Sequence, residues 1–292
     1  MSLKQIEYYK LRDFGEKFNV TFEFLKIHFK PLFIITMIVA IPTNIINLMV
    51  NSLLFKSLPT RMADESDFGE ALANLGGQLS LSMVLGFIGL VSTSVFLGAV
   101  LIYVKQAQNQ TVPPDVNEIF GKVLKKLPGL ILLSIVVSII IFFGLLFFII
   151  PGIYLGTVFS LSFVVFIFED EGFGNSLSKP FLIIKEKFFS TLGLLVVSTI
   201  IAGLVSSVFL VPAFILMIGD WFSITDLNNL NAENYILDYS DPKIIIGSFI
   251  SSFTTLVYII PIVAVCFQYF NLIERTEGRG FKSQIDDFEK LQ

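Results

Sequence analysis

The chain alternates between long runs of apolar residues without a charge and shorter segments that carry most of its charged residues. Four of these runs are long enough for one membrane crossing each, because a helix needs about 20 mostly apolar residues to span a bilayer. We expect one transmembrane helix in each of them. They cover residues 32–55, 79–104, 190–218 and 244–273.

A fifth run, 127–168, has no charge over 42 residues and is too long for one crossing. As a helix it would measure roughly 63 Å at about 1.5 Å per residue, which is twice the ~30 Å of the hydrocarbon core. Pro151 and Gly152 lie inside it, and such a pair is typical of a tight turn. We therefore predict a hairpin turn there between two spans, 127–150 and 153–168, for a total of six. The second span is the shortest, and its full crossing stays open.

Basic residues divide the polar segments into two groups. Of the 20 Lys and Arg residues, 17 fall in the N-terminal segment, in two internal segments and in the tail, and three fall in two other segments. Six spans place the two groups on opposite sides. Because Lys and Arg collect on the cytoplasmic side, both termini are expected there, with the first span as an uncleaved anchor. The basic group is 1–31, 105–126, 169–189 and 274–292, and the other is 56–78 and 219–243.

An amphipathic stretch precedes the first span, and a similar one precedes the fifth. In both, apolar residues recur at spacings of three and four, which place them on one face of an α-helix. A shorter stripe follows Asp115-x-x-Glu118, a helix start resembling a capping box, and Asp13-x-x-Glu16 has the same form. The two long interfacial stripes, offset by 159 residues, are Phe14, Phe18, Phe22, Leu25 and Phe29, and Phe173, Leu177, Phe181, Ile184 and Phe188.

These patterns predict an all-α membrane protein with a single integral membrane domain, 1–292. Its six transmembrane helices are expected as three parallel repeats, each a cytoplasmic amphipathic helix followed by a transmembrane hairpin. We assign the repeats to 11–104, 113–168 and 170–273, before a cytoplasmic tail, 274–292. Alternatively, any amphipathic helix in front of a span has this pattern of Phe and Lys without internal duplication.

The surface helices are expected to lie in the membrane interface, with their Phe stripes toward the acyl chains. Packing under the bundle, as a cytoplasmic collar, is the competing arrangement. Lysines near anionic headgroups contribute about 1 kcal/mol each. The same side also carries 15 acidic residues, so no lipid-specific site is predicted.

Composition agrees with a membrane protein and limits the chemistry. Hydrophobic residues make up 54% of the chain, the mean hydropathy is +0.79 and 15% of residues are charged, against about 25% charged in soluble proteins. One Cys excludes a disulfide framework and a thiolate zinc site. No charged residue lies inside the predicted spans, which disfavours proton-coupled transport and intramembrane proteolysis. We predict no catalytic residue, cofactor, metal site or nucleic-acid partner.

Asn44, Asn47 and Asn51 share one face of the first span. They predict either a polar groove for a solute or interhelical contacts, which contribute about 0.6–2 kcal/mol each. Gln268 and Asn271 lie near a span end and are expected to face headgroups.

Two further segments carry expectations about packing. The second span is rich in Gly and Ser over 80–98, and such helices usually lie centrally, where backbones approach closely. The acidic run 169–171 is expected to be the solvated start of the third surface helix.

Two sequence stretches carry a resemblance. Residues 149–155, Ile-Ile-Pro-Gly-Ile-Tyr-Leu, and 168–178, which begin Phe-Glu-Asp-Glu-Gly-Phe-Gly, resemble a pattern in polytopic inner-membrane proteins of Bacteroidota. They also look like the membrane domain that precedes the catalytic domain in some bacterial glycerophosphodiester phosphodiesterases. The resemblance covers about the middle third of the chain, and it implies a membrane-embedded partner module. It transfers no catalytic residue, because the catalytic domain has no counterpart here.

The expected function is that of a non-enzymatic integral membrane subunit that anchors or scaffolds a membrane protein complex. The alternative is a transporter or channel for an apolar or zwitterionic solute. In either case we expect a multi-pass protein of the cytoplasmic (inner) membrane. Its expected partners are the lipid bilayer and other membrane proteins, in a hetero-complex or a homo-oligomer.

Overall fold

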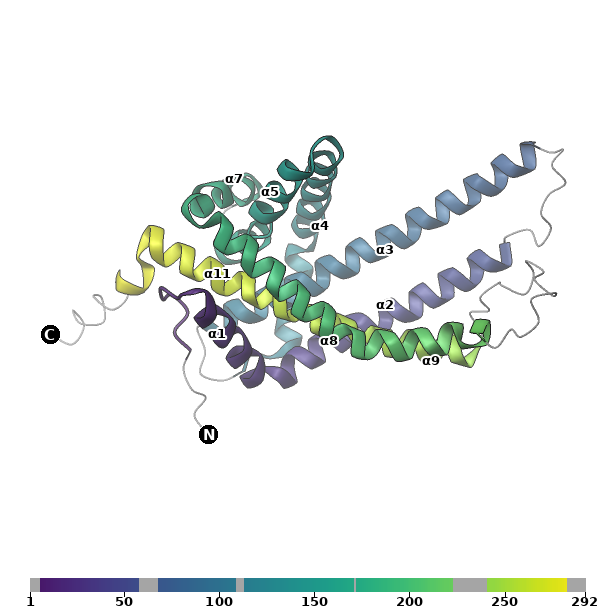
Figure 1. The fold of residues 1–292 in the computed structure, drawn as a ribbon, viewed down its shortest axis with the longest axis horizontal. Coiled ribbons are helices and arrows are strands. Elements are labelled where there is room, and N and C mark those ends of the chain that lie inside the picture. Colours follow the sequence, from purple (N-terminus) through teal and green to yellow (C-terminus); the bar gives the residue numbers. More distant parts are fainter. Residues whose placement is uncertain (1–5, 58–67, 109–112, 171, 223–240, 283–292) are drawn as a thin grey trace. The chain divides into compact units, whose positions relative to one another are not determined.

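A computed structural model describes residues 6–57, 68–108, 113–170, 172–222 and 241–282. All regular structure in these ranges is helical (Figure 1). The helices are α1 (Phe14–Ile27), α2 (Phe29–Ser57), α3 (Phe68–Gln108), α4 (Val116–Phe147), α5 (Ile149–Phe159), α6 (Ser162–Phe168), α7 (Phe173–Ile184), the short 3₁₀ helix η1 (Lys185–Lys187), α8 (Phe188–Phe222), α9 (Pro242–Ser252), α10 (Thr254–Val257) and α11 (Ile259–Glu277).

Six helical stretches in the described part of the chain are long and apolar enough to cross a membrane. This confirms the all-α class and the predicted number of spans, and it identifies a multi-pass membrane protein. The stretches are Phe29–Leu53, Gly76–Gln108, Val116–Phe147, Ile149–Phe168, Phe173–Met217 and Pro242–Glu277.

The hairpin between α4 and α5 turns at Phe148, not at Pro151 and Gly152. Phe148 is extended, with φ −154° and ψ 124°, and Pro151 lies in the first turn of α5. A helix tolerates Pro there because the first backbone N–H groups have no intrahelical acceptor. Gly152 allows the two helices to meet, since a Cβ on it would lie 2.7 Å from the backbone nitrogen of Leu145.

The three amphipathic stretches have different local structures. The first is a separate helix, α1, which begins with a complete capping box between Asp13 and Glu16. The second is the start of α4, which continues through Pro128 without a break. The third is α7, followed by η1. A shared spacing of apolar residues therefore does not produce a shared structure, and the repeats stay a prediction.

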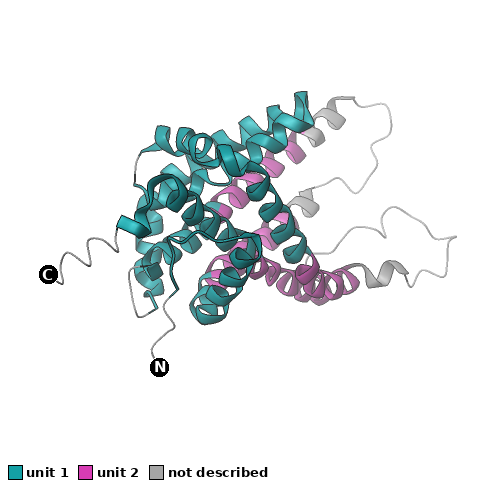
Figure 2. Ribbon diagram, turned by 60° about the vertical axis from the view of Figure 1, so that its left-hand side comes forward, with its two compact units in different colours: residues 1–35, 94–203, 258–292 teal, residues 36–93, 204–257 magenta. Residues whose placement is uncertain are grey.

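Contacts divide the chain into two compact units (Figure 2). Unit 1 comprises Met1–Ile35, Ser94–Gly203 and Tyr258–Gln292. Its most buried helix is α11, in which every residue from 263 to 273 is buried. Helices α1, α6 and α7 all contact α11. The expectation that the small-residue stretch 80–98 would be central is met only near its end, where a Cβ on Gly98 would lie 2.6 Å from Leu130.

Unit 2 comprises Thr36–Thr93 and Leu204–Val257. Polar side chains and close backbone approaches join its helices. The Thr43 hydroxyl in α2 donates to Ser92 Oγ in α3 at 2.9 Å. Helix α9 approaches α8 at Gly247, where a Cβ would lie 2.9 Å from the carbonyl oxygen of Ala213. Unit 2 is therefore held by specific contacts as well as by apolar packing.

Gly152→Ala should destabilise the protein, because the added methyl group would push α5 away from α4 at Leu145. Overpacking of this kind costs about 1–3 kcal/mol. Gly156→Ala on the same helix is the matched control, since a Cβ there meets nothing within 4 Å, and Ala is favoured over Gly by up to about 1 kcal/mol. Thermal unfolding in detergent micelles measures both. Equal midpoints for the two variants would contradict the close approach.

Candidate functional site

The Phe stripe of α1 is turned outward. Phe14 is 42% exposed and Phe22 is 43% exposed, whereas the buried face of the helix carries Lys17, Val20 and Phe24. The stripe is therefore available to lipid, as the interfacial arrangement predicts. The face that docks on unit 1 was not singled out by hydrophobic spacing, because it includes a lysine.

The stripe of α7 packs inward instead. Phe173, Leu177 and Phe181 lie against a core cluster of Leu133, Val137 and Phe159. Phe188, at the start of α8, contacts Tyr154, with 5.2 Å between the ring centroids. The same spacing thus produces an exposed face in α1 and a contact with the helix bundle in α7.

Within unit 2, the Asn face of α2 makes contacts within and between helices. The Asn44 amide donates to the Ser248 carbonyl of α9 at 2.8 Å. Asn51 donates to the carbonyl of Asn47 in its own helix at 2.7 Å, and Asn47 is half-buried. The contact of Asn44 favours the interhelical interpretation over a solute groove, and that of Asn51 is internal to α2. The Asn44 Oδ1 atom is nevertheless buried without a hydrogen-bond partner.

The expectation that Gln268 and Asn271 face headgroups is wrong. Both are almost fully buried, at 0% and 1% exposure. The Gln268 amide donates to Thr191 Oγ1 of α8 at 2.7 Å, and the Asn271 amide donates to the carbonyl of Arg12 at 3.1 Å. They attach α11 to α8 and to the segment before α1.

The expectation of a solvated acidic run is wrong for Glu169, and residue 171 lies outside the described residues. The side chain of Glu169 is 2% exposed and lies at the centre of an ion-pair cluster. It accepts hydrogen bonds from Tyr269 Oη at 2.5 Å, from Arg279 at 3.2 Å and from Lys179. Glu277 pairs with the same two cations, at 2.9 Å from Lys179 and 2.6 Å from Arg279.

Asp170 extends this cluster to α3 and α4. It pairs with Lys105 at 2.5 Å and with Lys126. Partial burial opposes ionisation of Asp170, but the hydrogen bonds from these two lysines outweigh it and lower the pKa of the carboxyl group. Its φ of 53° lies in the left-handed region, which Asp tolerates better than most residues. The turn from α6 to α7 is thus attached to α3, α4 and α11.

The histidine of the chain has a structural contact. His28 is 7% exposed, and its Nδ1 atom lies 2.7 Å from Tyr103 Oη. Burial lowers the pKa of the imidazole, so His28 is neutral at neutral pH. Its contact closes the junction between α1 and α2 against α3.

A basic cavity of about 420 Å³ lies in unit 1, where α1 begins, α8 begins and α11 ends. Among the described residues that line it, the basic side chains outnumber the acidic ones by four to one. The lining consists of Leu11, Arg12, Asp13, Phe14, Lys17, Lys187, Ser190, Asn271 and Arg275.

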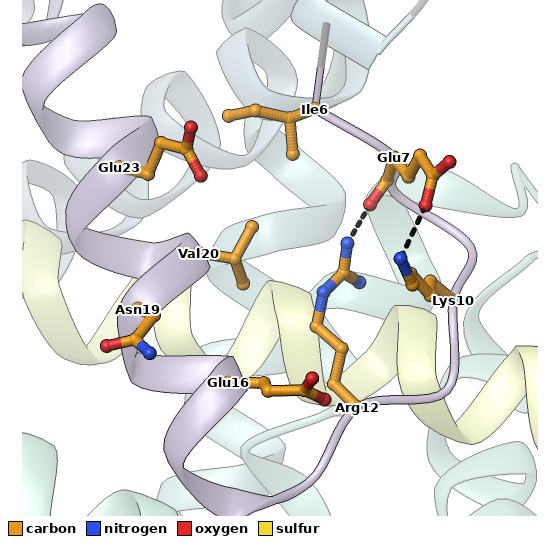
Figure 3. Close-up of a pocket in the computed structure, with 8 residues that line it drawn as sticks. All are labelled: Ile6, Glu7, Lys10, Arg12, Glu16, Asn19, Val20 and Glu23. Atoms are coloured by element: carbon orange, nitrogen blue, oxygen red, sulfur yellow. Dashed lines mark hydrogen bonds and ion pairs between the residues drawn. The ribbon is translucent and has the colours of Figure 1, made fainter.

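A second cavity, of about 370 Å³, lies between α1 and the segment before it (Figure 3). Its lining includes Glu7, Glu16 and Glu23. Glu7 pairs with Lys10 at 2.9 Å, and hydrogen bonding and attraction from Lys10 lower the pKa of Glu7. Arg12 donates to the Glu7 and Tyr8 carbonyls. This cavity therefore contains both signs of charge, and one pair of them, Glu7 and Lys10, is in contact.

Among the residues that the structure describes, no group of three His, Cys, Asp or Glu side chains converges as a metal site. No family model matches the chain, and neither a curated protein nor a solved structure matches it.

Glu169→Gln should destabilise the protein by roughly 2–4 kcal/mol. The amide would present N–H donors to Lys179 and Arg279 and would remove the charge that both cations face. This estimate is below the cost of breaking a fully buried pair because both cations are partly exposed. Glu118→Gln is the matched control, since Glu118 forms a surface pair with Lys122, worth about 0–1 kcal/mol. Denaturant unfolding in micelles compares them, and similar losses would contradict a central role for Glu169.

Proposed function

We propose that the protein is a non-enzymatic subunit of the bacterial inner membrane that anchors or organises other membrane proteins. The observation that carries this proposal is the use made of polar side chains in the spans. Thr43 and Asn44 bind neighbouring helices in unit 2, and Gln268 does so in unit 1. Because these polar side chains bind neighbouring helices, they favour a rigid framework over a catalytic site.

The charged cluster supports the same proposal. Glu169, Asp170 and Glu277 are all engaged by basic side chains within unit 1, so their charge stabilises the protein rather than a reacting group. The resemblance of 149–155 and 168–178 to membrane modules that accompany a catalytic domain agrees with a partner role.

Transport of an apolar or zwitterionic solute is the second candidate. The buried Oδ1 atom of Asn44 has no partner, and it would accept a hydrogen bond from a solute. A free acceptor inside a span is costly unless something binds it. This atom favours transport, although other buried polar atoms in the described chain, Gln268 Oε1 among them, also have no partner. The contact of Asn44 with α9 favours the framework.

Purification from the native membrane in mild detergent, followed by mass spectrometry, tests the partner role. We expect defined membrane proteins to co-purify, and we expect their amount or location to change when the chain is deleted. The Glu118→Gln variant, which we expect to fold like wild type, is tagged and purified in the same way and should retain the same co-purifying proteins. The purified protein alone, reconstituted in liposomes, should neither move solute nor turn over lipid. Either activity would overturn the proposal.

The proposal includes an orientation with both termini in the cytoplasm, supported by the division of Lys and Arg into 17 and three. It also includes three parallel repeats, supported by the apolar spacing shared at an offset of 159 residues. Lys185→Cys in a Cys266→Ala background tests it, because residue 185 is exposed in η1 and Cys266 is buried. A membrane-impermeant maleimide should label this cysteine only after the cells are opened. Labelling in intact cells would show that residue 185 lies outside and would contradict the proposed orientation.

A further inference from the structure

Lys17 is a buried cation without a carboxylate partner. It lies in α1 and is 3% exposed, and its Nζ atom donates to Ser190 Oγ at 3.2 Å. A hydroxyl oxygen does not neutralise a charge, and an unneutralised buried ammonium is costly. Burial lowers the pKa of Lys17, and the positive charges of Lys187 and Arg275 lower it further, while the negative charge of Asp13 opposes the shift without reversing it. Three cations therefore approach one another around the basic cavity.

The cations are not balanced within the described part of the chain. No ion pair with a described residue forms at Lys17, Lys187 or Arg275. Asp13 supplies the carboxylate among the described lining residues, and its Oδ1 atom is occupied by the backbone N–H of Glu16 at 2.7 Å. Arg12 also lines the cavity, but its guanidinium donates to backbone carbonyls and lies 5.6 Å from the ring of Phe267.

We propose that this basic cavity binds a phosphate group, carried by an acidic phospholipid or by a soluble phosphate compound. Lys17 would contact it from the buried side, while Lys187 and Arg275 would close on it from the rim. A guanidinium donates two parallel hydrogen bonds to phosphate oxygens, and ammonium groups supply point charges. The N-terminus of α1, which borders the cavity, adds partial positive charge. This site goes beyond the proposed framework function and does not depend on it.

Phosphate fits better than a carboxylate for two reasons. The four basic side chains of the lining face one carboxylate, that of Asp13, and a phosphate offers more acceptor oxygens than a carboxylate does. The volume of about 420 Å³ also lies within the range of about 300–1,000 Å³ that is usual for small-molecule sites.

The cavity also lies where the headgroup of a membrane phospholipid could enter it. Lys17 precedes one apolar span, Lys187 ends η1 directly before α8, and Arg275 lies in the last turn of α11. A cavity beside the ends of these apolar helices suits a ligand from the membrane–water boundary. Phe14 lines it and is 42% exposed. Phe189, next to Ser190, is 83% exposed. A phospholipid would place its phosphate among the cations and its acyl chains along these rings.

Lipid binding to the delipidated full-length protein tests the site. Native mass spectrometry would measure the affinity for dioleoyl phosphatidylglycerol, with dioleoyl phosphatidylcholine as the neutral comparison. Lys17→Gln and Arg275→Gln should each weaken binding of phosphatidylglycerol roughly tenfold, the loss expected for one charge-assisted hydrogen bond. Lys26→Gln is the matched control, because Lys26 is exposed on the same helix outside the cavity lining. Its affinity should stay within about twofold of wild type.

Arg275→Gln keeps the test valid if Lys17→Gln fails to fold, because Arg275 is exposed. Thermal unfolding with inorganic phosphate forms the second arm, since a ligand that binds only the folded state raises the midpoint. If the protein prefers phosphatidylglycerol and Arg275→Gln abolishes this preference, the result supports the site and identifies a phospholipid as the carrier of the phosphate. Stabilisation by inorganic phosphate alone, lost in the same variant, supports it with a soluble source. Binding that is absent in both arms, or equally weakened by Lys26→Gln, overturns the proposal.

Discussion

The need to pair polar groups inside a largely apolar protein governs most of the specific contacts in this structure. Hydrocarbon offers no hydrogen bonds, so a buried donor or acceptor must find its partner within the protein. Glu169 meets this need with Tyr269, Lys179 and Arg279. A carboxylate held by three donors fixes the turn from α6 to α7 against α11, and α11 in turn is the most buried helix of unit 1.

The polar residues of α11 extend this arrangement along its length. Gln268 holds α8, Asn271 holds the segment before α1, and Tyr269 holds the α6–α7 turn. Three residues within one turn of α11 thus contact three different neighbours. Hydrophobic packing alone would let these helices rotate or slide, whereas such contacts specify one arrangement.

Hydropathy predicted the number of spans because each apolar run is long and uncharged. It misplaced the hairpin turn by three residues, since Pro151 suits the first turn of a helix as well as a loop and Gly152 is needed for close packing. The cluster around Glu169 was missed for a different reason. Its cations lie 10 and 110 residues away in the chain, and no local pattern connects them. The apolar spacing does not predict the buried face of α1, because Lys17 interrupts it.

Lys17 differs from the other buried polar groups in what it lacks. Glu169 is buried with opposite charges. The side chain of Gln268 is neutral, and its amide donates to Thr191 although its Oε1 atom has no partner. Lys17 carries a charge and faces two further cations across an open cavity. Conformational specificity does not require such an arrangement, because an apolar residue at position 17 would dock α1 on unit 1 at a lower cost. A lysine at position 17 is explained if an anion from outside the chain supplies further negative charge to the cavity. Unit 1 then has two groups of charged residues. The ion-pair cluster around Glu169 holds its helices together, and the basic cavity around Lys17 is completed by an anion.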